Sequence, residues 1–498
     1  MRLSVPKEVF DIYNRLIENN HKAYLVGGCS RDLIIGREPK DWDITTDARP
    51  PELQLLFPES VYENQFGTVG VKTKSDDERL KIVEITTFRL EGKYSDKRHP
   101  DDIKFADTVE EDLARRDFTI NAIAFEATND QRLTTDDPIF VEGEIIDPFH
   151  GGEDIESKII RTVGEPGKRF NEDALRMMRA VRFSCELDFE IEEKTEKGIK
   201  ANNHLLGVIA KERIRDELTK IIMSPKAKYG LEKLEELGLL KYILPEFREG
   251  IGVGQNKHHK YTVWEHGILS LDYAAEEKYS LEVRLAALTH DIGKPRVKTG
   301  EGPDSHFFSH EVVGEEMASK MLDRLHFSRE TIAKVAMLVR FHMFKADPDE
   351  ITEAAVRRTI RSVGSENIWE LINLRTADRI GSGVPKAQPF RLRAYMALVE
   401  KNLREPVSLK QMVLKGDHLM ELLKIPAGPK VGWILYILFE EVLDAPEKNN
   451  LDYLEKRAGE LGGLSDVELG KMAEKAKSAY TQILSEEEEE IKKKYYVD

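Results

Sequence analysis

The stretch AYLVGGCSRDLIIGREPKDWDITT, residues 23–46, places a strand pattern, a glycine pair, a helix pattern and a second strand pattern in close succession. Gly27 and Gly28 permit a tight turn and a close approach of the backbone to a ligand. The segment SRDLIIG then predicts a helix whose N-terminal amides favour an anion. Arg31 falls in the first turn of this helix, where its guanidinium can hold a phosphate through two hydrogen bonds. The stretch therefore predicts a phosphate-binding turn.

The end of the same stretch, DWDITT at residues 41–46, predicts a strand with paired carboxylates. Because side chains alternate along a strand, Asp41 and Asp43 project from one face and Trp42 from the other. Two adjacent carboxylates repel unless a cation lies between them, and magnesium is commonly bound by one or two carboxylates together with substrate phosphates. Each feature alone would be an ordinary turn or a solvated strand end. Together they favour metal-dependent phosphoryl transfer.

Three stretches carry a resemblance to a known family: residues 25–46, EEDLARRDFTINAIAF at 110–125, and RFNEDALRMMRAVRF at 169–183. They resemble successive motifs of the class II tRNA nucleotidyltransferases and their poly(A) polymerase relatives, in the same order. The resemblance implies a polymerase-β-like head, a helical neck and body, and addition of C, C and A to the tRNA 3′ end from CTP and ATP without a template. Ser30 stands where the family usually has an aliphatic residue.

The second motif offers phosphate and ribose contacts. Arg115 and Arg116 could bind phosphate, and the amide of Asn121 could hydrogen-bond a ribose hydroxyl. Alone, this segment would be a surface helix start capped by Asp117. The resemblance implies that Arg116 contacts the incoming nucleotide and that this region favours ribose over deoxyribose.

The third motif offers a base reader. Asp173, Arg176, Arg179 and Arg182 recur every three residues, so the first three are predicted to line one helical face. An aspartate acceptor beside an arginine donor complements the edges of cytosine and adenine, whereas uracil and guanine present a carbonyl where the aspartate needs a donor. The mismatch would reject UTP and GTP, because unpaired buried polar groups are costly. Without the two upstream motifs, salt links on an exposed helix would be the better interpretation.

Histidines and aspartates farther along the chain resemble the ligand order of the HD phosphohydrolase superfamily, whose helical domain binds one or more divalent metals. Imidazole-rich sites suit manganese, nickel, cobalt or zinc, whereas the carboxylates of the head suit magnesium. A vestigial site that only ties helices together is the alternative. His258, His259, His306 and His326 match no role and are expected at the surface. The ligand candidates are His266, His290, Asp291, His310, His342 and Asp378.

The composition argues against several classes of protein. The net charge of −16 argues against a protein that coats nucleic acid by bulk charge, so a nucleic-acid site must be a local patch. The 498 residues contain no apolar run of membrane-spanning length and no apolar core of a secretion signal. Two cysteines cannot form a disulfide framework. We therefore expect a cytoplasmic protein of several domains.

The expected fold class is α+β, with a mixed-sheet head followed by helices only. Complete CCA addition is the first choice, because residues 88–105 resemble the family's flexible loop, with Tyr94 and Arg98. An A-adding or poly(A) polymerase, an HD phosphohydrolase acting on 2′,3′-cyclic or terminal phosphates, and a noncatalytic RNA-binding protein are the alternatives, and the oligomeric state stays open. The expected segments are the head (1–150), the neck with the base-reading helix (151–225), the body and linker (226–255), the HD domain (256–385) and the C-terminal body (386–498), which ends in a solvated helix or frayed tail at residues 485–498.

Overall fold

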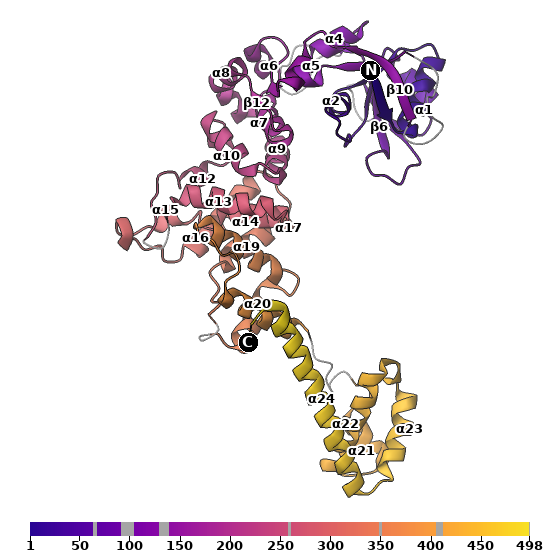
Figure 1. The fold of residues 1–498 in the computed structure, drawn as a ribbon, viewed down its shortest axis with the longest axis vertical. Coiled ribbons are helices and arrows are strands. Elements are labelled where there is room, and N and C mark those ends of the chain that lie inside the picture. Colours follow the sequence, from indigo (N-terminus) through magenta and orange to yellow (C-terminus); the bar gives the residue numbers. More distant parts are fainter. Residues whose placement is uncertain are drawn as a thin grey trace. The chain divides into compact units, whose positions relative to one another are not determined.

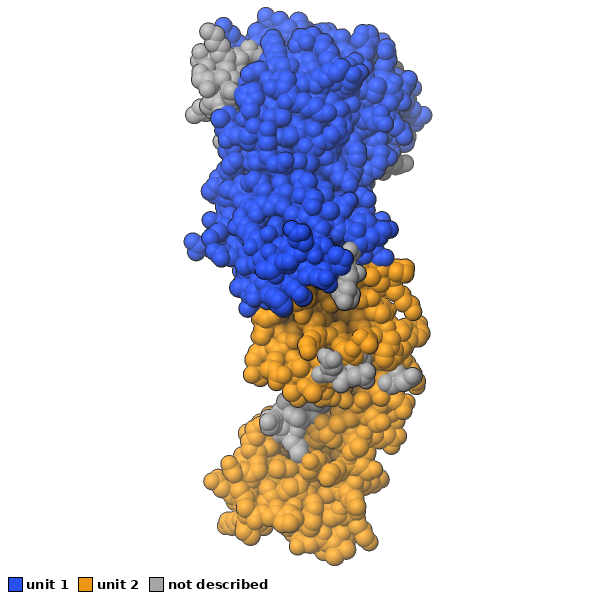
Figure 2. Space-filling model, turned by 90° about the vertical axis from the view of Figure 1, so that its left-hand side faces the viewer, with its two compact units in different colours: residues 1–340, 381–383 blue, residues 341–380, 384–498 orange. Residues whose placement is uncertain are grey.

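The computed structural model describes residues 1–62, 67–90, 104–128, 139–256, 260–347, 351–404 and 412–497. It divides into two compact units, coloured separately in Figure 2: residues 1–340 with 381–383, and residues 341–380 with 384–498. The boundary at residue 340 falls inside the segment expected for the HD domain, and the finer five-segment division stays a prediction. Tyr94, Arg98, His258 and His259 lie outside the described residues.

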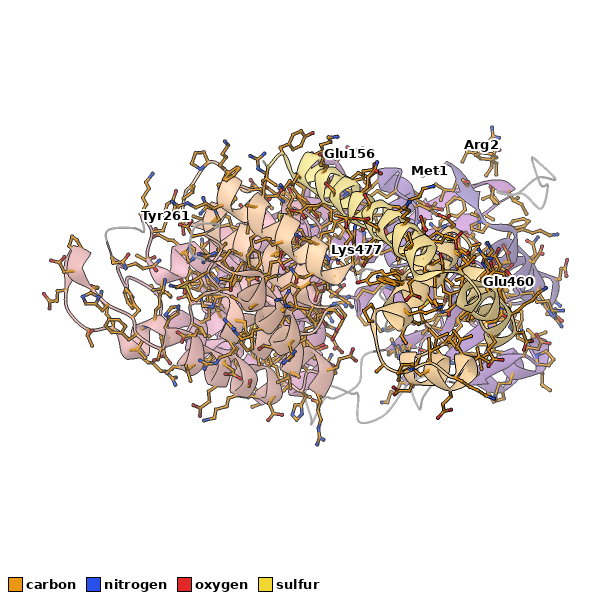
Figure 3. The ribbon with its side chains drawn as sticks, turned by 90° about the horizontal axis from the view of Figure 1, so that it is seen from below. Met1, Arg2, Glu156, Tyr261, Glu460 and Lys477 are labelled. Atoms are coloured by element: carbon orange, nitrogen blue, oxygen red, sulfur yellow. The ribbon has the colours of Figure 1, made fainter. Side chains whose placement is uncertain are left out.

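Unit 1 begins with a mixed sheet in the order β1-β10-β9-β2-β3-β6-β5-β4. Neighbouring strands of this sheet run antiparallel, except that β3 pairs with β6 in parallel. Arg2, labelled in Figure 3, lies on the β1 edge with its guanidinium over the ring of Phe140, 4.6 Å from the centroid. The strands are β1 (Arg2–Val5), β2 (Ala23–Val26), β3 (Asp43–Thr46), β4 (Ser60–Tyr62), β5 (Thr68–Lys72), β6 (Ile82–Thr87), β9 (Ala124–Ala127) and β10 (Ile139–Ile146).

Period-two alternation gives this sheet two different faces. Leu25, Ile44 and Ile85 point into a core that includes residues of helices α1 and α3. Asp43 and Glu84 occupy the neighbouring positions on β3 and β6, and therefore project from the opposite face. The alternation of apolar and acidic residues thus puts two carboxylates on the side of the sheet that is free to form a site.

Helices make up most of the rest of unit 1 (Figure 1), which confirms the predicted α+β class with a helical remainder. Two short strand pairs accompany them: β7 (Arg89–Leu90) with β8 (Lys104–Phe105), and β11 (Ile159–Ile160) with β12 (Glu190–Ile191). The helices are α1 (Lys7–Glu18), α2 (Gly28–Ile35), α3 (Pro50–Leu56), α4 (Val109–Ala114), η1 (Thr119–Asn121), α5 (Gly151–Glu156), α6 (Pro166–Glu172), α7 (Arg176–Leu187), α8 (Glu193–Asn202), η2 (Asn203–Val208), α9 (Lys211–Met223), α10 (Ala227–Glu236), α11 (Leu240–Ile243), α12 (Pro245–Arg248), α13 (Val263–Glu276), α14 (Leu281–Thr289), α15 (Lys294–Val297), η3 (Gly302–Asp304), α16 (His310–Arg324) and α17 (Arg329–Phe341).

Two local expectations need correction. The expected strand over 41–46 begins only at Asp43, although Trp42 is buried in the core beneath the sheet as alternation predicts. The helix expected across the third motif is divided, because Asp173 has extended backbone angles (φ −142°, ψ 106°) and its carboxylate accepts a hydrogen bond from the Leu175 amide at 3.0 Å. Asp173 therefore stands before α7 and does not share a helical face with Arg176 and Arg179.

In the described residues of unit 2, all the regular elements are helices. In its C-terminal part, α21 to α24 pack around Leu419, Ile434, Leu438 and Leu454, and Figure 1 shows the long α24 beside α22. Across the described parts of both units, no helix is long and apolar enough to cross a membrane. The helices are α18 (Glu353–Val363), α19 (Ile368–Gly381), α20 (Phe390–Leu403), α21 (Gly416–Leu423), α22 (Pro429–Asp444), η5 (Pro446–Lys448), α23 (Leu451–Gly462) and α24 (Asp466–Tyr495).

The segment expected to be a solvated helix or frayed tail is helical up to Tyr495, as the last part of α24, and one face of it packs against α20. Ile491 and Tyr495 are buried with Ala397 of α20, while most of the glutamates of the acidic run stay exposed. Glu400 of α20 accepts hydrogen bonds from Lys494 Nζ at 2.7 Å and from the Tyr495 hydroxyl at 2.6 Å. The polar run therefore has one solvated face and one packed face.

Replacing Glu400 should loosen this helix end. Burial raises the pKa of its carboxyl, but the bonds from Lys494, Tyr495 and Arg404 outweigh that effect and lower the pKa to about 2. We expect Glu400→Ala to cost about 2 kcal/mol at neutral pH. The loss should shrink as the pH falls from about 4.5 towards 2, where the native carboxylate itself becomes protonated.

Hydrogen exchange of the last turns of α24, together with thermal unfolding, measures this effect. Glu489→Ala is the matched control, because Glu489 is exposed on the same helix and pairs only weakly with Lys493 at 3.8 Å. Equal exchange rates in the two variants would contradict the packing role of Glu400.

Candidate active site and metal-ligand cluster

A cavity of about 1110 Å³ opens on the polar face of the head sheet in unit 1. Its walls come from the glycine turn before α2, from β3 and β6, from α7 and from the start of α9. Arginine is the commonest lining residue, in a chain whose net charge is −16. The cavity is therefore the kind of local basic patch that the overall acidity requires for a site that binds polyanions.

The glycine turn lies directly against the carboxylates and a guanidinium. Gly27 has φ +74°, a conformation that residues with side chains rarely adopt. A Cβ there would lie 2.9 Å from Arg116 Nη1 and 3.2 Å from Asp43 Oδ2, and a Cβ at Gly28 would lie 3.6 Å from Asp41 Oδ1. Gly27 therefore keeps open the space between Asp43 and Arg116, whereas a Cβ at Gly28 would make only an ordinary contact with Asp41.

The carboxylates of this face repel one another. Desolvation and the negative charges of Glu84 and Asp41, opposed by Arg116, together raise the pKa of Asp43 to about 7. Glu84 stands directly opposite Asp43 in the parallel register of β3 and β6. The sequence interpretation missed Glu84, although it is the acidic residue among the alternating apolar positions of KIVEITTF. Carboxylate oxygens are the donors that magnesium prefers, but the oxygens of Asp41, Asp43 and Glu84 do not lie within 4.8 Å of one another as a three-residue cluster, so Asp41 and Asp43 are the candidate pair.

A buried aspartate holds the two arginines of the second motif. Asp112 accepts hydrogen bonds from Arg115 Nε at 2.9 Å and from Arg116 Nη2 at 3.3 Å. Burial raises the pKa of Asp112, but the charges of Arg115 and Arg116 outweigh it and lower the pKa. The sequence interpretation did not identify Asp112. It precedes the two arginines by three and four residues, a spacing that places side chains next to each other on a helix surface.

Asp117 joins α7 to the head. Its carboxylate accepts from Arg179 Nε at 2.7 Å and from Asn121 Nδ2 at 3.1 Å, and the Asn121 side-chain oxygen accepts from Arg31 Nη1 at 2.7 Å. Burial raises the pKa of Asp117, yet Arg179, Asn121 and Arg176 hold it well below its usual range. Asn121 lines the cavity, and its contact with a ribose hydroxyl stays a prediction.

Three guanidiniums lie around the ring of Phe183 at the cavity wall. The guanidinium carbons of Arg31 and Arg179 both lie 5.2 Å from the ring centroid, and that of Arg182 lies 4.2 Å away. Cation–π attraction of this kind offsets part of the repulsion among the arginines. Arg182 also pairs with Glu217 of α9 at 2.8 Å. Phe183 was not singled out from the sequence, because nothing in its spacing separates it from a core aromatic.

The proposed base-reading residues line the same cavity but have other partners. Asp173 forms a two-point salt bridge with Arg213 of α9, at 2.7 Å and 3.2 Å. Arg176 donates to Glu172 Oε2 at 2.7 Å and to the Arg115 carbonyl at 3.1 Å. Arg213 was missed, since it lies 40 residues beyond Asp173 and only the fold brings the two together.

Four of the six predicted HD ligands form a buried cluster in unit 1. The Nε2 atoms of His266 and His290 lie 2.9 Å apart, and Asp291 Oδ2 is 3.3 Å from the first and 3.4 Å from the second. His310 Nε2 lies 3.3 Å from Asp291 Oδ1. Lys294 Nζ lies 2.6 Å from Asp291 Oδ2, and this ammonium and His290 hold the pKa of Asp291 well below its usual range despite burial.

The orientation of these imidazoles suits metal ligation. His290 Nδ1 lies 2.9 Å from the Ala287 carbonyl, and His310 Nδ1 lies 2.8 Å from the Phe307 carbonyl. Such bonds keep the proton on Nδ1 and leave the Nε2 lone pair free to bind a metal. The Nε2 spacing of His266 and His290 matches two ligands about 2.0–2.1 Å from one ion. His342 and Asp378 are both buried and belong to unit 2, where Asp378 Oδ2 accepts a hydrogen bond from Arg375 Nη1 at 2.8 Å.

Comparison with protein families identifies three consecutive parts of the chain. Residues 23–161 match the poly(A) polymerase head domain, and residues 188–250 match the probable RNA- and SrmB-binding site of polymerase A. Residues 259–380 match the HD domain. The class is therefore that of nucleotidyltransferases with a poly(A) polymerase head and an HD domain, as the three motifs and the histidine pattern predicted.

Individual relatives show more closely which family this chain belongs to. The CCA-adding enzyme of Lactococcus lactis subsp. lactis is 32% identical over 440 residues, which cover 88% of this chain and 93% of that protein. The chain belongs to the family of the CCA-adding enzymes. The CCA-adding enzymes of Lactobacillus helveticus and Geobacillus stearothermophilus are 44% and 43% identical over 44% and 48% of this chain. In these two alignments the chain spans about half the length of the curated relatives, 51% and 54%.

Solved structures show the same fold. The crystal structure of the Bacillus stearothermophilus CCA-adding enzyme in complex with CTP aligns over 91% of this chain and 96% of that chain, with a TM-score of 0.58 and 28% identity. A tRNA nucleotidyltransferase complexed with a primer tRNA and an incoming ATP analogue aligns over 78% of this chain and 99% of that one, with a TM-score of 0.52 and 21% identity. The second likeness concerns the fold alone.

The raised pKa of Asp43 predicts that this carboxylate destabilises the metal-free protein. The native state holds a proton that the unfolded chain releases, so the cost grows as the pH rises from about 4 to about 7 and then levels off. We expect Asp43→Asn to raise the free energy of unfolding by about 1 kcal/mol at pH 8 and by less at pH 5, in the absence of divalent metal.

Chemical denaturation at the two pH values measures this gain. Asp41→Asn is the matched control, because Asp41 is exposed and solvent screens its charge. If Asp43→Asn instead lowers the free energy of unfolding at pH 8, the result would contradict the expected repulsion among the carboxylates.

Proposed function

We propose that this chain adds C, C and A to the 3′ end of tRNA from CTP and ATP in a magnesium-dependent nucleotidyl transfer. The observation that carries the proposal is the glycine turn of Gly27 and Gly28, which lies against Asp41, Asp43 and Arg116 in one arginine-lined cavity. Family membership and the CTP complex of the Bacillus stearothermophilus relative support the same conclusion.

Each group has a distinct task in this mechanism. The turn lets the triphosphate approach the backbone amides at the start of α2, and Arg116 binds phosphate oxygens. Arg31 contributes positive charge from the wall, although Asp32 and Asn121 already accept hydrogen bonds from its guanidinium. Asp41 and Asp43, with Glu84 beside them, would hold magnesium. When bound, the ion stabilises the charge that develops on the triphosphate and lowers the pKa of the attacking hydroxyl.

Base selection falls to Asp173 and the start of α7, which line the same cavity. Asp173 accepts from the exocyclic amine that cytosine and adenine share, and Arg176 lies on the adjoining α7 as the donor that the motif resemblance assigns. Uracil and guanine place a carbonyl against the aspartate, which leaves both acceptors unpaired. We propose complete CCA addition over A-addition or poly(A) synthesis, because the relative that matches nearly the full chain is named a CCA-adding enzyme.

The test follows labelled CTP and ATP into a tRNA that lacks its CCA end, with and without magnesium. Asp41→Ala and Asp43→Ala should each reduce transfer at least 10³-fold while the protein stays folded, because neither side chain belongs to the core. Near-normal transfer by both variants would contradict the assignment, and transfer that needs no divalent ion would contradict the magnesium role.

We propose a second, metal-dependent hydrolytic activity at the HD cluster. The close approach of His266, His290 and Asp291 in a buried pocket of nitrogen and oxygen donors favours it, because such a set suits manganese, nickel, cobalt or zinc. The resemblance adds His342 and Asp378 as ligands. A 2′,3′-cyclic phosphate at a damaged tRNA end is the substrate that would connect the two activities, since hydrolysis exposes a hydroxyl for extension.

The two activities should be separable. The double variant His290→Ala with Asp291→Ala should lose bound transition metal and any 2′,3′-cyclic phosphodiesterase activity measured with nickel or manganese, yet still add CCA. Elemental analysis of the purified protein gives the metal readout independently of turnover. Absence of hydrolysis in the wild type would make the cluster structural, and loss of CCA addition in the folded double variant would show that the sites are coupled.

A further inference from the structure

Arg213 lies outside the three motifs, yet it contacts the carboxylate proposed to read the base. Its Nη2 lies 2.7 Å from Asp173 Oδ2 and its Nη1 3.2 Å from Asp173 Oδ1. The two side chains are largely shielded from solvent, at 24% and 16% exposure. Parallel hydrogen bonds of this kind fix the plane of a carboxylate as well as its position.

A third bond completes the restraint. The Leu175 amide donates to Asp173 Oδ1 at 3.0 Å. A carboxylate has about four lone-pair sites, and the two bonds from Arg213 and the one from Leu175 use three of them. Both sites of Oδ1 are occupied, which leaves Oδ2 with room for one further donor. Asp173 lines the cavity, so this remaining site is the one available to a nucleotide.

Helix α9 gives Arg213 a firm base. Farther along the same helix, Glu217 pairs with Arg182 of α7 at 2.8 Å. At its C-terminal end, Arg284 of α14 donates to the Ile222 carbonyl at 2.9 Å and to the Ser224 carbonyl at 3.3 Å. The helix that carries Arg213 is therefore held at both its middle and its end, which fixes the backbone of Arg213, while the two hydrogen bonds to Asp173 restrain its guanidinium.

We propose that Arg213 is a specificity-determining positioning residue: it holds Asp173 so that a single acceptor site on Oδ2 faces the base. This inference rests on the proposed nucleotide addition. One fixed acceptor matches one exocyclic amine, which cytosine and adenine each have. It also places fixed negative charge against the carbonyl of uracil or guanine, because the pinned carboxylate cannot rotate away.

Removing the guanidinium should therefore cost selectivity more than stability. We expect Arg213→Ala to lower the preference for CTP over UTP, as the ratio of kcat/KM values on tRNA lacking CCA, by roughly tenfold to a hundredfold. Arg213→Lys should fall between Arg213→Ala and the wild type, because a lysine keeps the charge but cannot hold both oxygens. Arg215→Ala is the matched control, since Arg215 lies on the same helix and pairs with Asp216 outside the cavity.

A double-mutant cycle separates positioning from a general structural role. If Arg213 acts through Asp173, Arg213→Ala should have no further effect on the CTP to UTP ratio in an Asp173→Ala background. A CTP analogue that lacks the exocyclic amine should be used equally by wild type and Arg213→Ala, because it offers no donor to Oδ2. Equal selectivity in wild type and Arg213→Ala, or additive effects in the cycle, would overturn the proposal.

The outcomes also distinguish this inference from the proposed function. A wild-type protein that transfers neither CMP nor AMP to tRNA would refute nucleotide addition itself. A wild-type protein that transfers both, with selectivity unchanged by Arg213→Ala, would refute only the role of Arg213. Thermal unfolding of each variant checks that lost selectivity does not come from lost folding.

Discussion

The ion pair between Asp117 and Arg179, whose side chains are 9% and 33% exposed, is the contact on which the geometry of the cavity depends. It joins the end of the second motif to α7, and through Asn121 it extends to Arg31 at the glycine turn. Such a pair gives little net stability, because desolvation of the buried carboxylate offsets much of its Coulomb attraction, but losing Arg179 would leave the buried charge of Asp117 uncompensated. Its contribution is therefore geometric, since it holds the glycine turn and α7 at one distance.

Like charges repel one another in two parts of the cavity. Carboxylates gather on β3 and β6, while guanidiniums gather around Phe183 and Asp112. Each group is destabilising when taken alone, and the two meet at the glycine turn, where a Cβ at Gly27 would lie 2.9 Å from Arg116 Nη1 and 3.2 Å from Asp43 Oδ2. Concentration of strain at a functional site is common, because the rest of the fold compensates for it.

Much of the site could be predicted from the sequence, because its residues lie at short spacings within single elements. Period two placed Asp43 on the open face, and the glycine pair marked the turn. Asp173 was misplaced because helical periodicity does not reveal that its own side chain caps Leu175 and interrupts the helix. Glu84 and Arg213 were missed because each reaches the site across the fold, one through strand register and the other through an ion pair over 40 residues.

Helix α9 has one further consequence. Its first turns carry Arg213 at the cavity, while its final carbonyls are held by Arg284 of α14, the helix that His290 directly follows. One inserted or deleted residue between these two anchors would turn one end relative to the other by about 100°. The length of α9 therefore fixes the spacing between the arginine-lined cavity and helix α14, and α9 should tolerate substitutions on its solvent side far better than any change in length.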